Sequence, residues 1–201
     1  MNKKNKQKSH SFKKKRMSDG ERFALLASLS EIVFHSDDLA NLWNIHNKNT
    51  LYTTLFRYVK RGLIFRIYNG FYSIKKINDI DPYFLGIKSL HKLTYVSCES
   101  VLFEYGILNQ RSQSITLVSS ISKSFSIGGK RYRSRQMKDE YLFNHSGIEI
   151  IGSIRKASVE RAVADMLYFN RKKYFDAFDS KLINWNKVKK IIKDVGYKIK
   201  L

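Results

Sequence analysis

One predicted helix, residues 50–61, carries the side chains whose spacing best suits contact with another molecule. At about 100° per residue, its hydroxyls and cations fall on the side opposite its leucines. Hydroxyls near the start of such a helix suit DNA base edges, and cations in its second half suit phosphates. Arg57 is placed to form two hydrogen bonds with a guanine. The predicted DNA-contacting side comprises Thr50, Thr53, Thr54, Arg57, Lys60 and Arg61.

The opposite side of this helix is predicted to be apolar and to dock on two earlier helices. Thr50 is expected to be its N-cap, and Gly62 is expected to end it. The alternative is an ordinary amphipathic helix with a solvated polar side, but the glycine and the hairpin that follow favour contact with DNA. The residues expected to dock are Leu51, Tyr52, Leu55, Phe56, Tyr58 and Val59.

The flanking segments predict elements that would position this helix. One helix is expected to begin near Ser18, and a second is expected to be capped by Ser36. After Gly62, two β-rich runs flank Asn69-Gly70, which is a strong hairpin signal. Three helices followed by a hairpin predict a winged helix-turn-helix over residues 18–78. Further contacts to DNA are expected from the turn and the wing, through Lys48, Arg66, Tyr68 and Asn69.

The charge of the chain favours a polyanionic partner. Lys and Arg number 38 against 17 Asp and Glu, which gives a formal net charge of +21. Residues 1–16 hold eight basic side chains and no acid, so residues 1–17 are expected to form a disordered basic arm. Residues 39–78 also lack acids. A generally Lys-rich proteome would raise the total, so the distribution of charge is more informative than its sum.

Residues 79–201 predict a mixed α/β domain, so the whole chain is expected to be α+β. Helices are expected after Asp81-Pro82, after the cap Ser97 and after the cap Ser158. Strands are expected over residues 114–119, on both sides of Gly128-Gly129, and as a short buried strand over residues 148–151. A basic helix is expected over residues 185–195.

Three arginines alternate along one of these strands and would share a face. Arg131, Arg133 and Arg135 are expected to contact a protein partner or nucleic acid, or else to form a charged, solvated edge. Arg161 and Asp165 are expected to form an i,i+4 pair on the surface.

No catalytic or metal site is predicted from the sequence. The five histidines show no metal-ligand spacing, and Cys98 is expected to be a small buried residue. Glu149, Glu160 and Asp165 are the only candidates for a nuclease cluster, and the last two would diverge on one helix. We therefore expect neither an enzyme nor a cofactor. No segment suits a signal peptide or a membrane span, and a cytoplasmic protein is expected.

Several motifs resemble the AbiEi-type antitoxin family. TLYTTLFRYVKRGLIFRIYNGFYSI, residues 50–74, resembles the family's winged-helix N-terminus, which has a KRGLI step and an R-x-x-x-G-x-Y wing. YVSCESVLFEYGI, residues 95–107, and SVERAVADML, residues 158–167, are similar to segments of the family's C-terminal domain. The resemblance covers roughly residues 21–169.

The resemblance implies a function in a type IV toxin–antitoxin system that acts in phage defence by abortive infection. Such a protein would repress its own promoter and counteract a nucleotidyltransferase toxin. Winged-helix proteins often bind inverted repeats as dimers, so double-stranded DNA and a second copy are the expected partners. A plain winged-helix repressor without a toxin, and less favourably a nuclease, remain open at this point.

Overall fold

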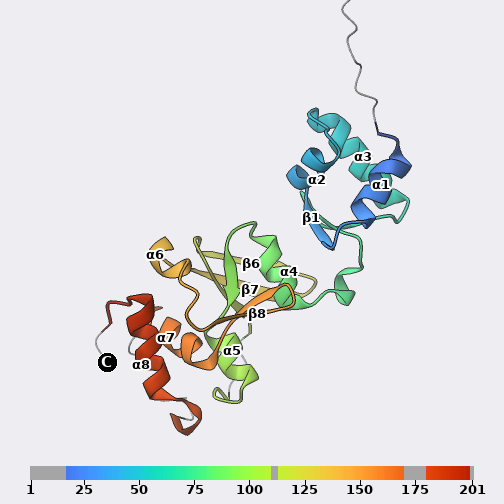
Figure 1. The fold of residues 1–201 in the computed structure, drawn as a ribbon. Coiled ribbons are helices and arrows are strands. Elements are labelled where there is room, and N and C mark those ends of the chain that lie inside the picture. Colours follow the sequence, from blue (N-terminus) through green and yellow to red (C-terminus); the bar gives the residue numbers. More distant parts are fainter. Residues whose placement is uncertain (1–16, 110–112, 170–179, 200–201) are drawn as a thin grey trace, which may run out of the picture.

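The protein is an α+β structure with two separate β-sheets (Figure 1). The computed structural model describes residues 17–109, 113–169 and 180–199, so the predicted basic arm lies almost wholly outside the described residues. A three-stranded sheet has the order β1-β3-β2, and a six-stranded sheet has the order β6-β7-β5-β4-β9-β8. Each sheet belongs to a different part of the chain.

The first part contains three helices and the three-stranded sheet. β1 and β2 both pair with β3 in antiparallel fashion. The helix start predicted at Ser18 is confirmed, because Ser18 Oγ accepts a hydrogen bond from the Glu21 N–H and the Glu21 carboxylate accepts one from the Ser18 N–H. The elements are α1 (Asp19–Ala27), β1 (Val33–His35), α2 (Ser36–Leu42), α3 (Lys48–Lys60), β2 (Phe65–Tyr68) and β3 (Phe71–Ser73).

Two aromatic side chains hold the three helices of this part together. Trp43 and Tyr58 are buried, and their rings lie edge to face with centroids 5.4 Å apart. The Tyr58 hydroxyl donates to the Asp19 carbonyl at 2.7 Å, and Trp43 Nε1 donates to the Arg22 carbonyl at 3.1 Å. Both polar atoms are thus satisfied within the core, and α1 is tied to α3 and to the end of α2. Ser36 is the first residue of α2 rather than its cap, which is His35.

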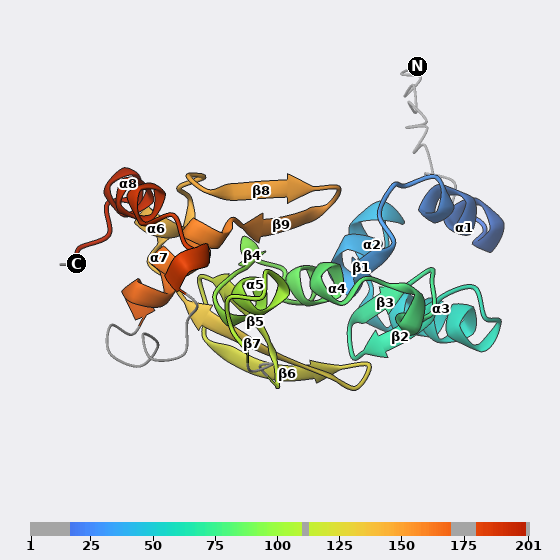
Figure 2. The same ribbon diagram turned by 90° about the horizontal axis from the view of Figure 1, so that it is seen from below.

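The second part is a mixed sheet with helices on both faces (Figure 2). β5 and β7 are parallel neighbours, as are β4 and β9, whereas β6 and β8 form antiparallel edges. The short η1 (Ile77–Asp79) leads into it. The other elements are α4 (Pro82–Ser89), β4 (Thr94–Val96), α5 (Glu99–Glu104), β5 (Ile115–Ser119), β6 (Lys123–Ile127), β7 (Lys130–Gln136), α6 (Asp139–Leu142), β8 (Ile148–Ile151), β9 (Ile154–Ala157), α7 (Val159–Phe169), η3 (Ser180–Leu182) and α8 (Trp185–Val195).

A glycine allows α4 to lie directly on the sheet. A Cβ atom on Gly86 would lie 2.5 Å from the Tyr132 ring, so only glycine fits there. The Tyr132 hydroxyl also donates to the Pro82 carbonyl at 3.0 Å. Arg135, three residues further along β7, points to the other face, where it meets Glu99 of α5 and the ring of Phe169 in α7.

α4 also joins the two parts of the chain. The Tyr68 hydroxyl of β2 donates to the Ser89 carbonyl at 2.8 Å, and His35 Nε2 lies 2.9 Å from the Lys88 carbonyl. Lys88 Nζ donates to Glu31 at 2.8 Å. Val33 and Phe71 are buried in the same core cluster as the residues of the larger sheet. The three-stranded sheet therefore packs against the second part.

The i,i+4 pair in α7 is buried, which corrects the expectation of a surface pair. Arg161 and Asp165 are both fully buried, and Arg161 Nε donates to Asp165 Oδ1 at 2.8 Å. Tyr95 of β4 and Tyr197, beyond α8, each donate a hydroxyl to the Asp165 carboxylate. Because this network joins α7 to the central strand and to the end of the chain, it has a structural role.

Two other local expectations are wrong. The cap of α5 is Cys98 rather than Ser97, with a left-handed φ of 55°, while Ser97 Oγ donates to Asp165. β8 is an exposed edge strand rather than a buried one, with Ile150 69% exposed. The hairpin at Gly128-Gly129, the start of α7 after Ser158 and the extent of α8 are confirmed. None of the helices in the described ranges is long and apolar enough to cross a membrane.

Candidate nucleic-acid interface

The start of α3 is set by Asn47, not by Thr50. Asn47 Oδ1 accepts the Thr50 N–H at 3.0 Å, and the helix begins at Lys48. Asn44, with φ of 51°, turns the chain between α2 and α3. Thr50 is an exposed residue of the first turn. The first turn of α3 therefore also includes Lys48 and Asn49.

The buried side of α3 differs from the predicted one. Thr54 is 0% exposed, and its hydroxyl donates to the Thr50 carbonyl at 2.8 Å. It lies with Leu51, Leu55 and Tyr58 in the core of the first part. Thr54 is therefore removed from the predicted DNA-contacting residues, because its side chain is sealed inside the protein.

Two aromatic residues predicted to dock on the earlier helices are instead exposed. Phe56 is 68% exposed and Tyr52 is 48% exposed. α3 is therefore rotated about its axis relative to the prediction. The side of α3 that faces solvent, its open side, is centred on exposed residues at spacings of four, three and four, namely Asn49, Thr53, Phe56 and Lys60. Asn49, Tyr52 and Phe56 were missed by the sequence reasoning. The signal was the Asn47 cap, which places Asn49 inside the helix.

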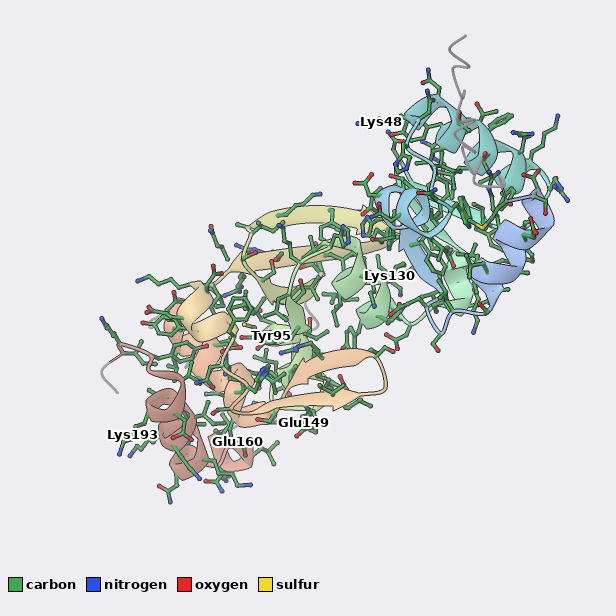
Figure 3. All side chains as sticks on the ribbon, turned by 45° about the horizontal axis from the view of Figure 1, so that its top comes forward. Lys48, Tyr95, Lys130, Glu149, Glu160 and Lys193 are labelled. Atoms are coloured by element: carbon green, nitrogen blue, oxygen red, sulfur yellow. The ribbon has the colours of Figure 1, made fainter. Side chains whose placement is uncertain are left out.

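Lys60 lies at the centre of this open side, and Lys48, Arg57 and the C-cap Arg61 lie around it. Lys48, Arg57, Lys60 and Arg61 are exposed, and Figure 3 shows Lys48 at the end of the molecule remote from Lys193. Arg57 Nε donates to the Thr53 carbonyl at 3.4 Å, which holds its stem along the helix. Arg61 Nη1 lies 3.7 Å from Asp19, which is a surface pair of small energetic value.

A hollow of about 570 Å³ lies beside the first turn of α3. His46, Asn47 and Thr50 line one part of it, and Arg22 and Arg57 line another. Arg22 Nε is buried and has no hydrogen-bond partner among the described residues. Cationic and polar walls next to a helix N-terminus suit a phosphate oxygen.

The β2–β3 hairpin turns at Asn69-Gly70 as predicted, with φ of 80° at Gly70. Arg66 Nη2 donates to Asn69 Oδ1 at 3.1 Å, and both residues are exposed. Tyr68 is 38% exposed, but its ring packs near Phe71 and its hydroxyl donates to the Ser89 carbonyl, so its polar end is engaged with α4. Burial raises the pKa of Tyr68. Of the predicted wing residues, Arg66 and Asn69 are thus exposed, and among the described residues their side chains are bonded only to each other.

The three arginines of β7 share a face as predicted, but two of them are engaged within the chain. Arg135 forms an ion pair with Glu99, and Arg131 Nη1 donates to Gln113 at 3.2 Å. Arg133 is exposed, with no ion pair or hydrogen bond from its side chain among the described residues. The face is therefore less available to a partner than its sequence suggests.

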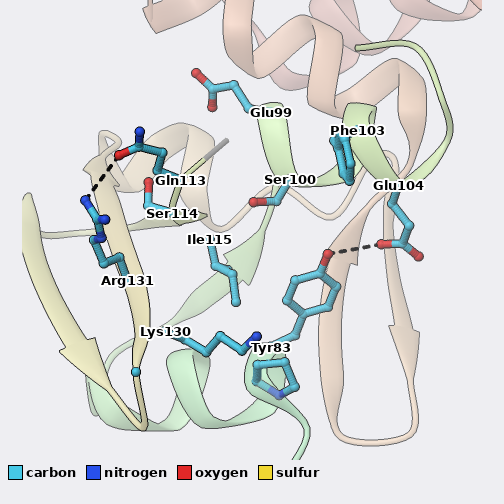
Figure 4. Close-up of a pocket in the computed structure, with 12 residues that line it drawn as sticks. Tyr83, Glu99, Ser100, Phe103, Glu104, Gln113, Ser114, Ile115, Lys130 and Arg131 are labelled. Atoms are coloured by element: carbon cyan, nitrogen blue, oxygen red, sulfur yellow. Dashed lines mark hydrogen bonds between the residues drawn. The ribbon is translucent and has the colours of Figure 1, made fainter. Parts of the chain in front are cut away.

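Beside this face lies a hollow of about 740 Å³ with walls of both charges (Figure 4). Lys130 and Arg131 reach it from the hairpin, whereas Glu99 and Glu104 reach it from α5. Glu104 is itself bonded to Tyr83 and to Lys156. Both carboxylates are thus paired with cations that do not line the hollow, Glu104 with Lys156 and Glu99 with Arg135, whereas Lys130 and Arg131 form no ion pair among the described residues.

The residues considered for catalysis are not assembled into a site. Asp165 accepts hydrogen bonds from Arg161, Tyr197, Tyr95 and Ser97, so both of its oxygens are occupied. Burial raises the pKa of the Cys98 thiol well above its usual value, as does the charge of Asp165, so its thiolate is disfavoured. In the described parts of the chain, no three His, Cys, Asp or Glu residues come together as metal ligands.

Comparison with known proteins gives a likeness in fold. No family model matches the chain, and no curated protein matches it. Its structure resembles the crystal structure of RV2827C protein from Mycobacterium tuberculosis, with a TM-score of 0.51 and 8% sequence identity. The likeness covers 85% of this chain and 69% of that one. At such low identity it shows a shared fold alone.

Proposed function

We propose that the protein is a transcriptional regulator that binds double-stranded DNA with the open side of α3 in the major groove. The observation that carries this proposal is the combination of exposed polar and cationic side chains on α3 with the absence of acids between residues 39 and 78. A helix of 13 residues is about 20 Å long, and the major groove admits an α-helix.

The elements around α3 support a winged helix-turn-helix over residues 18–78. α2 and α3 are joined by a short turn, as in the helix-turn-helix motif, and the β2–β3 hairpin follows α3 directly. In this arrangement the hairpin is the wing, and Arg66 and Asn69 contact the DNA backbone or the minor groove.

Each exposed residue of α3 has a role that follows from its chemistry. Asn49 is suited to adenine and Arg57 to guanine, since each can form two hydrogen bonds with that base. Thr53 contacts either a base or a phosphate, while Lys48, Lys60 and Arg61 neutralise phosphates. Lys and Arg contacts to phosphate make binding weaker as salt rises. No cofactor and no chemical step are needed.

Binding of the full chain to the DNA upstream of its own gene tests the proposal. Arg57→Ala should weaken specific binding by about 1–3 kcal/mol. Arg133→Ala removes the same charge from β7 and is the matched control, which should leave specific binding nearly unchanged. Equal losses in both variants would show that binding depends on net charge alone and would contradict the assigned role of α3.

Deletion of residues 1–16 tests the contribution of the basic arm. The deletion should weaken binding to all DNA sequences and flatten the dependence of affinity on salt, because eight basic side chains are removed. An unchanged salt slope would show that the arm makes no phosphate contacts.

We further propose that the protein is the antitoxin of a nucleotidyltransferase toxin, and this rests on the AbiEi resemblance of residues 50–74 and 158–167. A nucleotidyltransferase gene beside its own gene would support the assignment. Co-expression of this chain should then restore growth to cells that express that enzyme. A protein that represses its promoter but gives no protection would be a plain repressor.

A further inference from the structure

The exposed aromatic pair on α3 has no structural explanation within the described residues. Phe56 and Tyr52 lie four residues apart, so their side chains are neighbours on the helix surface. Phe56 is 68% exposed although burying such a side chain is worth about 1.5–3 kcal/mol. Most of this gain is not made within the free protein, which points to a contact of the ring with another molecule.

The surroundings of this pair restrict what that molecule is. Thr53 and Arg57 lie beside Phe56 on the exposed side of α3, and Lys60 lies one turn further on. The pair is therefore an apolar patch with cations around it. Such a patch matches a surface that is anionic at its edges and apolar in its middle.

We propose that Phe56, with Tyr52 beside it, contacts the C5-methyl groups of thymines in the major groove, so that the protein selects DNA sites with thymine at those positions. The inference rests on the proposed DNA binding by α3 and adds to it the base that is read. In the major groove, thymine presents a methyl group to apolar side chains, and phosphates line both edges of the groove.

A second copy of the chain is the main competing occupant, and charge disfavours it. A symmetric contact through the same patch would bring together Lys48, Arg57, Lys60 and Arg61 from both copies. Like charges so placed repel each other. DNA instead supplies a negative charge opposite each of these cations.

Replacement of thymine by uracil removes only the methyl group and tests the contact directly. The probe is the tightest-binding duplex that the full chain selects from random-sequence DNA, resynthesised with uracil at one thymine at a time. The unmodified protein should bind the uracil duplex about fourfold more weakly for each methyl contacted by Phe56. Phe56→Ala should bind both duplexes with the same reduced affinity, because the methyl has lost its partner.

Two controls separate this contact from general effects. Phe143→Ala removes an aromatic side chain that is 59% exposed but lies at the end of α6, and it should keep the full sensitivity to uracil. Phe56→Leu retains an apolar side chain and should therefore keep part of the sensitivity to uracil. A change in oligomeric state of Phe56→Ala without DNA would assign the patch to a second copy and overturn the proposal.

The outcomes of these experiments distinguish the thymine contact from the proposed DNA binding on which it rests. Failure to select any duplex would overturn both. Selection of a specific duplex whose affinity is unaffected by uracil at every position would overturn the thymine contact and leave DNA binding intact. A uracil effect of equal size in the unmodified protein and in Phe56→Ala would also overturn it, since the methyl would then contact another residue.

Discussion

Two helices of this protein depart from the usual rule of apolar inside and polar outside, in opposite directions. α3 leaves Phe56 in solvent, whereas α7 seals the charged side chains of Arg161 and Asp165 in the core. The difference lies in how each departure is compensated. In α7 every unfavourable group has a partner within the chain, but in α3 the exposed ring has none among the described residues.

The compensation in α7 is complete at Arg161. Its guanidinium has five N–H donors, and they bond to Asp165, to the Tyr95 hydroxyl and to the carbonyls of Asn144, Ser146 and Tyr141. Burial alone would lower the pKa of Arg161, but Asp165, Tyr95 and Tyr197 together outweigh it and raise the pKa. Buried charges whose hydrogen bonds are all made within the chain indicate a structural role. An exposed ring without a partner among the described residues indicates that another molecule covers it.

The largest expected effect comes from opening the α7 network. Arg161→Ala leaves the Asp165 carboxylate buried without its counter-charge, and we expect a loss of about 3–5 kcal/mol in the free energy of unfolding. Urea unfolding of the two proteins measures it. The double variant Arg161→Met with Asp165→Leu should recover only part of the loss, because it removes both charges but leaves the hydroxyls and carbonyls that they bonded without partners. A loss below 1 kcal/mol in Arg161→Ala would show that water reaches the pair.

Alkaline pH should weaken the same core through its tyrosines. Burial raises the pKa of Tyr132 to about 12, and burial together with the charge of Asp165 raises that of Tyr95 well above 10. Both hydroxyls therefore ionise more readily in the unfolded chain, so stability is fully present below about pH 9 and falls as pH rises through 10 to 12.

For Tyr132 the loss amounts to about 2–3 kcal/mol, since its pKa rises by two units at about 1.4 kcal/mol each. About half of this loss, or about 1.4 kcal/mol, is present at pH 11, and urea unfolding at pH 8 and at pH 11 measures it. Tyr132→Phe, which has no hydroxyl to ionise, should show a smaller fall than the unmodified protein. Identical falls would mean that Tyr132 is hydrated in the folded state.

The first turn of α3 gives a smaller effect. Asn47→Ala removes the cap that accepts the Thr50 N–H, and we expect it to cost about 1 kcal/mol of unfolding free energy. Thr50→Ala changes an exposed residue and should cost less than about 0.5 kcal/mol. The two values, measured by urea unfolding, decide where α3 begins. The reverse order would restore Thr50 as the cap.

Local signals in the sequence predicted most of the elements. Ser18, Asp81 before Pro82, and the Asn69-Gly70 and Gly128-Gly129 turns mark their positions by hydrogen bonds and backbone geometry that involve only nearby residues. Local signals of this kind are independent of the rest of the fold. They therefore predicted where helices and hairpins occur without predicting which way each one faces.

The orientation of α3 was not predictable in this way. The buried set Leu51, Thr54, Leu55 and Tyr58 is centred about 70° from the set inferred from apolarity alone, at 100° per residue. Thr54 can be buried because its hydroxyl bonds to the backbone of its own helix, which its residue type does not reveal.

The same limit applies to the α7 pair. An i,i+4 Arg–Asp spacing is typical of exposed helices, and its burial here depends on Tyr95 and Tyr197, 66 and 36 residues from Arg161 in the chain. Such long-range partners leave no mark on the local pattern. For α3, likewise, the helix was predicted but its rotation was wrong.

The smallest effect is expected at Phe56, where it is the most informative. Phe56→Ser should change the free energy of unfolding by less than about 0.5 kcal/mol, because the ring is exposed in the free protein. Its buried neighbour is the control, since Leu55→Ser should cost at least about 2 kcal/mol in the same urea titration. A comparable cost at Phe56 would mean that the ring is already covered within the chain or by a second copy, and the contrast between α3 and α7 would be lost. A variant as stable as the unmodified protein but weaker on DNA would instead separate folding from recognition at a single side chain.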